Sequence, residues 1–142
     1  MSAIVSKIVF VDGIDRTGKD SVIRAIHKKT KYKHVLVNRG PISYLAYHKI
    51  FDRDCVVSDY LNLLTPGTIS VVLVGDPSII KQRFVNTNEP DLPVSIEEAQ
   101  DILEIAADFA SAFVKSSCVH RVVIDGLSVD ELADFIIDSV GL

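Results

Sequence analysis

The sequence is poor in the residues and segments that mark several classes of protein. Two cysteines, Cys55 and Cys118, are too few for a disulfide framework and lack the spacing of a zinc site, so we expect buried thiols. No apolar run is long enough to cross a bilayer, and the N-terminus lacks the continuous apolar region of a secretory signal. We therefore expect a cytoplasmic protein with no membrane partner.

The chain also lacks an excess of positive charge. It has 15 Lys and Arg against 19 Asp and Glu, a formal net charge of −4, which argues against nucleic acid as a general partner. Cations do cluster from Arg24 to Lys33, where we favour a solvated helix end over a polyanion patch. The 48% hydrophobic content and the length predict one compact domain over residues 1–142.

What the sequence does contain is a buried strand, a glycine-framed loop and a helix within residues 8–26. The spacing Gly13-x-x-x-x-Gly18-Lys19 is that of a P-loop. Glycines let such a loop close around a phosphate, backbone amides and the helix N-terminus attract the anion, and Lys19 supplies a mobile cation. We favour nucleotide binding over a turn that binds nothing, and the residues concerned are Gly13, Ile14, Asp15, Arg16, Thr17, Gly18, Lys19, Asp20 and Ser21.

The remainder alternates apolar strands with helical patterns. Strands are expected at residues 7–11, 34–37, 69–74 and 121–124, and helices at residues 18–29, 41–51, 56–64 and 77–84. Two more helices follow capping boxes at Ser95/Glu98 and Ser128/Glu131, with Phe109, Phe113 and Phe135 among their apolar residues. Continuous apolar strands predict a parallel sheet covered on both faces, and hence a three-layer α/β P-loop NTPase fold of about four strands.

Several side chains follow the strands at the sheet edge where ligands of such folds bind. Arg39 suits a bidentate grip on a second phosphate, with a structural salt bridge as the alternative. Tyr44, Tyr47 and Phe51 follow on the next helix, where one ring could stack on a base, although core packing is the commoner role of each. Arg53 and Arg83 are candidate phosphate ligands, and exposed ion pairs are equally open for them.

Two residues inside the loop are candidates for chemistry. Arg16 can reach a phosphoryl group in transfer, where negative charge spreads over the equatorial oxygens, or it can face solvent. Asp15 can accept a hydrogen bond from a substrate hydroxyl or stabilise the loop turn.

These motifs resemble those of the thymidylate kinase family within the P-loop nucleoside and nucleotide kinases. The segment VDGIDRTGKDS resembles that family's E/D-G-x-D-x-x-G-K-[ST]-[ST] loop, and Asn38-Arg39 with Ser43 and Tyr47 resembles its D-R-x…S…Y stretch. VVLVGDPSIIKQRF and VVIDGLSVDEL are similar to two of its strand–helix segments. The resemblance implies Mg²⁺-dependent transfer of the γ-phosphoryl of ATP to a nucleoside monophosphate, with Lys19 on the donor phosphates, Arg39 on the acceptor phosphate and Arg16 as the catalytic cation.

The chain departs from the family pattern at three places. The segment between the first helix and Asn38 is too short for the family's usual acceptor-base pocket and fifth strand, so the expected order is 2-1-3-4. Asn38 stands where the family has an aspartate, and Asp20 where it has a hydroxyl. We hypothesise that these two changes are linked, so that Asp20 and Ser21 hold Mg²⁺ with the local charge unchanged. In the opposite interpretation, Asp20 repels the phosphates and marks a degenerate site.

The preferred function is phosphoryl transfer from ATP to a deoxynucleoside monophosphate, catalysed by positioning and by charge stabilisation through Arg16 and Lys19, with Asp15 orienting the acceptor. The alternatives are a deoxynucleoside kinase and a nucleotide-binding regulatory module without turnover. A homodimer is a further expectation, because a second copy could complete a shallow pocket.

Overall fold

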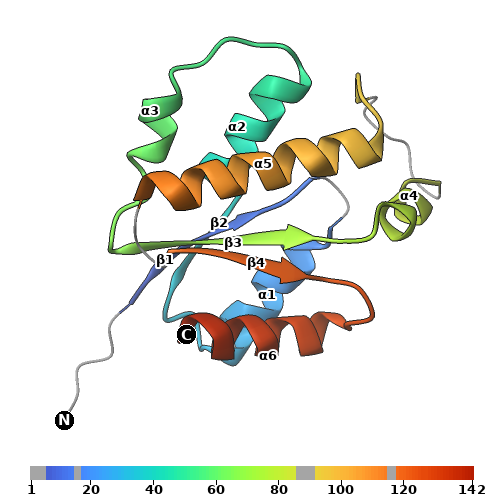
Figure 1. The fold of residues 1–142 in the computed structure, drawn as a ribbon. Helices are drawn as coiled ribbons and strands as arrows, with labels where there is room; N and C mark the ends of the chain where they lie inside the picture. Colours follow the sequence, from blue (N-terminus) through green and yellow to red (C-terminus); the bar gives the residue numbers. More distant parts are fainter. Residues whose placement is uncertain (1–5, 15–16, 86–91, 115–117) are drawn as a thin grey trace.

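The computed structural model describes residues 6–14, 17–85, 92–114 and 118–142, with only the backbone for 83–85 (Figure 1). Within these residues a single parallel sheet has the order β2-β1-β3-β4. The register places Val11 beside Asn38 of β2 and beside Val71 of β3. The predicted strand order is therefore confirmed, with strands β1 (Ile8–Asp12), β2 (Val35–Asn38), β3 (Thr68–Val74) and β4 (Val119–Val123).

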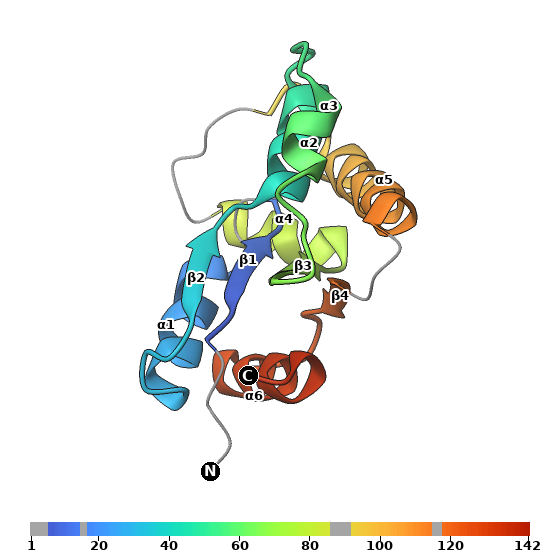
Figure 2. The same ribbon diagram turned by 90° about the vertical axis from the view of Figure 1, so that its left-hand side faces the viewer.

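Helices cover both faces of this sheet (Figure 2). The layer on one face contains α1 (Lys19–Lys29) and α6 (Val129–Val140). The layer on the other contains α2 (Pro41–Ile50), α3 (Val57–Leu61), α4 (Pro77–Val85) and α5 (Ile96–Val114). The predicted three-layer α/β architecture is confirmed, and none of the described helices has the length and apolar character needed to span a membrane.

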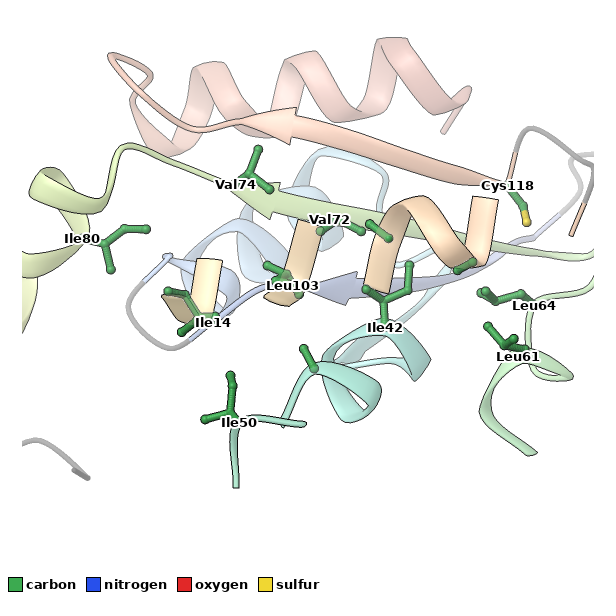
Figure 3. Close-up of a cluster of buried hydrophobic side chains, with 14 residues drawn as sticks. Ile14, Ile42, Ile50, Leu61, Leu64, Val72, Val74, Ile80, Leu103 and Cys118 are labelled. Carbon is green, nitrogen blue, oxygen red and sulfur yellow. The ribbon is translucent and has the colours of Figure 1, made fainter. Parts of the chain in front are cut away.

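Each face of the sheet has its own apolar core, because successive side chains of a strand point to opposite sides. From β3, Val72 and Val74 belong to the buried cluster on the side of α2 and α5, which also contains Ile42 and Leu103 (Figure 3). The intervening residues of β3, together with Val9 and Val11 of β1, point toward α1 and α6. Strands buried on both faces need apolar residues throughout, which is why they lack polar alternation.

One predicted helix is shorter than expected. The pattern predicts a helix at residues 56–64, but α3 ends at Leu61 and a turn leads into β3. In this turn the Thr68 hydroxyl accepts a hydrogen bond from the Thr65 N–H and donates to the Leu63 carbonyl. The turn still buries Leu64, so the apolar pattern continues although the helix does not.

Three phenylalanines of the predicted amphipathic helices are not in the core. Phe109, Phe113 and Phe135 are 56%, 50% and 51% exposed. The buried positions of α5 are Ala99, Gln100, Leu103, Ala107 and Ala110, a mostly small-residue stripe. Small side chains allow α5 to approach the sheet and α2 closely. The stripe of α5 that is buried is therefore narrower than the apolar stripe predicted from the sequence.

The two thiols differ in burial. Cys118 is buried as predicted, whereas Cys55 is only half-buried. Neither takes part in a disulfide, in line with the sequence expectation.

Candidate functional site

A buried carboxylate at the end of β1 joins α2 to the phosphate loop, our name for residues 13–21, which the sequence predicts will bind phosphate. Asp12 is fully buried, and its Oδ1 accepts hydrogen bonds from the backbone N–H groups of Gly40 (2.8 Å) and Ser43 (2.9 Å). Its Oδ2 accepts a bond from the Ser70 hydroxyl at 2.5 Å. The Ser43 hydroxyl in turn accepts from the Gly13 N–H at 3.0 Å. The loop and the start of α2 are thus held as one unit, with the carboxylate at the positive end of the helix dipole.

Both glycines of the loop occupy positions that other residues would strain. A Cβ on Gly13 would lie 2.8 Å from Thr17 Oγ1 and 3.2 Å from the Leu73 carbonyl oxygen. Gly18 is the N-cap of α1 with φ 86° and ψ 22°, in the left-handed region that glycine adopts without steric cost. The Thr17 hydroxyl donates to the Ile14 carbonyl at 2.9 Å.

The lysine of the motif is folded onto the loop. Lys19 is 7% exposed, and its ammonium donates to the carbonyl oxygens of Gly13 (3.1 Å) and Ile14 (2.8 Å). The cation therefore lies over the loop that the sequence predicts will bind phosphate, where it can exchange carbonyl oxygens for phosphoryl oxygens. Asp15 and Arg16 lie outside the described residues, so their catalytic and binding roles stay predictions.

The two unusual residues of the motif contact one another. Asn38, at the end of β2, donates through Nδ2 to Oδ1 of Asp20, in the first turn of α1, at 2.5 Å. Both side chains are exposed, and the neighbouring Ser21 hydroxyl accepts a bond from Arg24 at 3.4 Å. Asp20 and Asn38, the two residues that depart from the thymidylate kinase pattern, are therefore neighbours in space.

The donor atoms at this point fit a hard divalent cation only in part. Asp20 and Ser21 offer carboxylate and hydroxyl oxygens, which Mg²⁺ prefers. Among the described residues no group of three or more His, Cys, Asp and Glu is arranged to hold a metal ion. A metal here would complete its coordination with phosphate oxygens and water, as Mg²⁺ does when it binds together with a nucleotide.

A hollow of about 490 Å³ opens between α2 and α3 beside Arg39. The guanidinium of Arg39 lies 4.7 Å from the centre of the Tyr47 ring, and that of Arg53 lies 5.0 Å from the Phe51 ring. Guanidinium groups over aromatic faces gain cation–π stabilisation. The hollow brings together the following side chains: Arg39, Tyr44, Tyr47, His48, Phe51, Arg53, Tyr60 and Leu92.

Four of the five predicted acceptor residues, Arg39, Tyr44, Tyr47 and Arg53, share this hollow, while the side chain of Arg83 lies outside the described part. Sequence reasoning missed three of its lining residues. His48 follows Tyr44 by four positions on α2, a spacing that places both on one helix face and could have been noticed. Tyr60 and Leu92 come from other segments and give no local signal.

The hollow has aromatic walls and cationic groups. The Tyr44 and Tyr60 rings stack at 6.0 Å with an interplanar angle of 18°, and Tyr47 stacks on Phe51 at 6.2 Å and 17°. None of the described residues that line it is acidic. Such a lining suits a ligand that has both a flat ring and a negatively charged group, because stacking and guanidinium contacts then act together.

A smaller hollow of about 200 Å³ adjoins the phosphate loop itself. Thr17, Gly18 and Ser21 form one wall, and the segment after β4 forms the other through Ile124 and Leu127. The sequence analysis did not select Ile124 or Leu127. They could have been selected because they follow the last strand at the carboxyl edge of the sheet, where ligands of parallel sheets bind.

The turn after β3 has a structural role. The Asp76 carboxylate accepts hydrogen bonds from the Ser78 backbone N–H and hydroxyl, both at 2.9 Å, so Asp76 caps the start of α4. The bond from the backbone N–H, followed by that from the hydroxyl, holds the pKa of Asp76 below its usual value. The Asp76 N–H donates to Asp125 at 2.9 Å, which ties this turn to the segment after β4.

Comparison with solved structures identifies the fold. The thymidylate kinase of Candida albicans is similar with a TM-score of 0.62 at 12% identity, over 96% of this chain and 92% of that one. The tunicamycin resistance protein of Deinococcus radiodurans gives 0.56 at 13% identity, over 97% of each chain. The shikimate kinase of Bacteroides thetaiotaomicron gives 0.53 at 12% identity, over 96% and 99%. Neither a family model nor a curated protein matches the sequence. The chain has the α/β fold of these three proteins, two of which are kinases.

Proposed function

We propose that this protein is a P-loop kinase that transfers a phosphoryl group from ATP to a nucleoside monophosphate, with a deoxynucleotide as the preferred acceptor. The observation that carries the proposal is the hollow of aromatic rings and guanidinium groups next to the phosphate loop. Asp12 holds the loop and the hollow in a fixed relative position. It lies next to the loop and accepts hydrogen bonds from Gly40, which directly follows Arg39, and from Ser43 in the first turn of α2. Donor and acceptor would therefore meet at one edge of the sheet.

In the proposed reaction the protein positions two anions and stabilises the charge between them. Lys19 binds the donor phosphates, and Arg39 holds the acceptor phosphate in front of the Tyr44 and Tyr47 rings. Arg16 stabilises the phosphoryl group in transfer, and Asp15 orients the acceptor. The smaller hollow beside Thr17 and Gly18 accommodates the base of ATP.

We propose that Asp20 and Ser21 hold Mg²⁺ together with the nucleotide. The ion supplies neutralisation of phosphate charge when it is bound. The Asn38 amide is the partner that orients the Asp20 carboxylate, which accounts for the pair of exchanged residues. We expect the Asp20→Thr variant to bind ATP more weakly in the presence of Mg²⁺, and the double variant Asp20→Thr/Asn38→Asp to recover. Calorimetry with ATP, with and without the metal, measures both, and stronger binding by Asp20→Thr would refute the linkage.

The test of the function is product formation from ATP and Mg²⁺ against a panel of deoxynucleosides and their monophosphates, measured by chromatography. We expect one monophosphate to be phosphorylated, and Arg16→Ala to abolish turnover. Arg39→Ala should raise the KM for the acceptor more than about tenfold, because a bidentate contact to phosphate is lost. Arg121→Ala is the matched control, since Arg121 lies on β4 in ion pairs with Asp108 and Glu104.

A second candidate is a nucleotide-binding module without turnover, and the Asp20 carboxylate beside the phosphate loop favours it through repulsion of phosphates. The same panel separates the two candidates, because ATP binding without any product supports the module. Phosphorylation of a nucleoside instead of a monophosphate supports the third candidate, a deoxynucleoside kinase. The cytoplasm is the proposed location, and the homodimer stays a prediction that mass determination in solution would test.

A further inference from the structure

The wall of the acceptor hollow contains a hydrogen-bonded pair that the sequence analysis did not select. His48 of α2 and Tyr60 of α3 are joined between Nε2 and the phenol oxygen at 2.9 Å. Their rings are tilted by 53° with centroids 5.5 Å apart. Tyr60 also stacks on Tyr44, and all three side chains line the hollow. The ring of Tyr60 is thus held from two sides with its hydroxyl at the wall.

The surroundings of the imidazole decide which atom of this pair donates. Nδ1 of His48 is buried and has no hydrogen-bond partner within the described part of the chain. A proton on Nδ1 would leave a buried N–H donor without an acceptor, whereas a lone pair there is the smaller loss. We therefore assign the proton of a neutral ring to Nε2, which donates to Tyr60.

This assignment determines what Tyr60 offers to a ligand. Its oxygen already accepts the bond from His48, so its own O–H remains to donate. The two arginines of the hollow are also donors only. Among the described residues that line the hollow, none is acidic and none competes for the Tyr60 O–H. A ligand is thus recognised at this wall through hydrogen-bond acceptors.

We propose that Tyr60 is a specificity-determining residue of the acceptor site, and that it donates its hydroxyl proton to a carbonyl oxygen or unprotonated ring nitrogen at the edge of the acceptor's heteroaromatic ring. His48 is the positioning residue that sets the direction of this bond. The inference rests on the proposed function, because it concerns the same hollow. It adds that the ring of the acceptor is selected by its hydrogen-bond acceptors as well as by stacking.

The test compares binding of nucleoside monophosphates and of ribose 5-phosphate, which has no ring to be read, by calorimetry. We expect Tyr60→Phe to lower the affinity for the best-bound monophosphate about five- to tenfold, which corresponds to the loss of one hydrogen bond. The affinity for ribose 5-phosphate should not change. Tyr32→Phe is the control for loss of a phenol hydroxyl, because Tyr32 is 75% exposed and stacks on His27. Far-UV circular dichroism verifies that both variants are folded.

The outcomes distinguish this inference from the proposed function. Equal affinity of wild type and Tyr60→Phe for every monophosphate would refute the role of Tyr60 while the acceptor site stands. Failure of all monophosphates to bind the wild type would refute the acceptor site and the inference with it. Nitrogen-15 NMR of the histidine ring gives an independent test, in which a protonated Nε2 and an unprotonated Nδ1 are expected. A proton on Nδ1 would overturn the assignment.

Discussion

Replacement of Asp12 by alanine is the perturbation that tests most directly how the site is assembled. The carboxylate is fully buried and accepts three hydrogen bonds, from the N–H groups of Gly40 and Ser43 and from the Ser70 hydroxyl. Alanine removes all three bonds and leaves two backbone N–H groups in a site without water access. We expect both a large loss of stability and a loss of acceptor binding.

The magnitude follows from the partners that are left behind. A buried donor without an acceptor costs about 1–3 kcal/mol, and the Ser70 hydroxyl can turn to another acceptor. Asp12→Ala should therefore lower the free energy of unfolding by about 3–5 kcal/mol, a large part of the roughly 5–15 kcal/mol typical of a domain. Asp12→Asn keeps an oxygen that accepts from the N–H groups of Gly40 and Ser43, and its NH₂ can donate to the Ser70 hydroxyl. We therefore expect this variant to lower the free energy of unfolding by only about 1–2 kcal/mol.

Urea unfolding followed by far-UV circular dichroism measures these differences, because the chain has no tryptophan to report by fluorescence. The affinity for the acceptor monophosphate should fall in both variants, since Arg39 directly precedes the backbone that Asp12 holds. Stability of Asp12→Ala within about 0.5 kcal/mol of wild type would refute the reasoning, since surface substitutions have effects of that size. Equal destabilisation by alanine and asparagine would refute the assignment of hydrogen bonds.

Two further predictions concern the helix ends. Gly18→Ala should lower the free energy of unfolding by about 1–2 kcal/mol in thermal melts, because a Cβ at φ 86° is strained, while Gly67→Ala, with nothing nearer than 4.0 Å to its Cβ, should have little effect. The backbone N–H of Ser128, and then its hydroxyl, hold the pKa of Glu131 below its usual 4.5. The capping box of α6 therefore stabilises the fold above pH 4.5, and this contribution disappears as the pH falls through the lowered pKa. The melting temperature should therefore decrease less between pH 7 and pH 3 in Glu131→Gln than in wild type. An equal decrease in both proteins would contradict the stabilising role of the Glu131 carboxylate.

Much of the fold could be predicted from local patterns. The apolar runs of β1 and β3 and the spacing of Gly13, Gly18 and Lys19 gave the strands, the loop and the start of α1. The strand order 2-1-3-4 followed from the resemblance to the thymidylate kinase family, with one strand fewer than that family has. The capping box at Ser128 and Glu131 is complete in the structure, since it depends only on residues three positions apart.

Other features depended on contacts between distant residues. Phe109 and Phe113 fit an amphipathic pattern, yet α5 buries its alanines instead, because the space beside α2 sets which stripe of the helix faces inward. Periodicity describes one helix alone and contains no information on the width of the groove that receives it. The early end of α3 also depends on a contact outside the helix, because the Thr68 hydroxyl bonds the Leu63 carbonyl and fixes the turn before β3.

The sequence by itself predicted a phosphate-binding loop at the carboxyl edge of a parallel sheet, because the spacing of its glycines and lysine is a local property of the backbone. It also indicated Arg39, Tyr44, Tyr47 and Arg53 as candidates, and tertiary structure gathered these into one hollow. Only the folded chain decided that Asp12 binds the start of α2, that Asp20 meets Asn38 and that His48 meets Tyr60. These pairs lie 12 to 31 positions apart, so their contacts exist only once the sheet and its helices have packed.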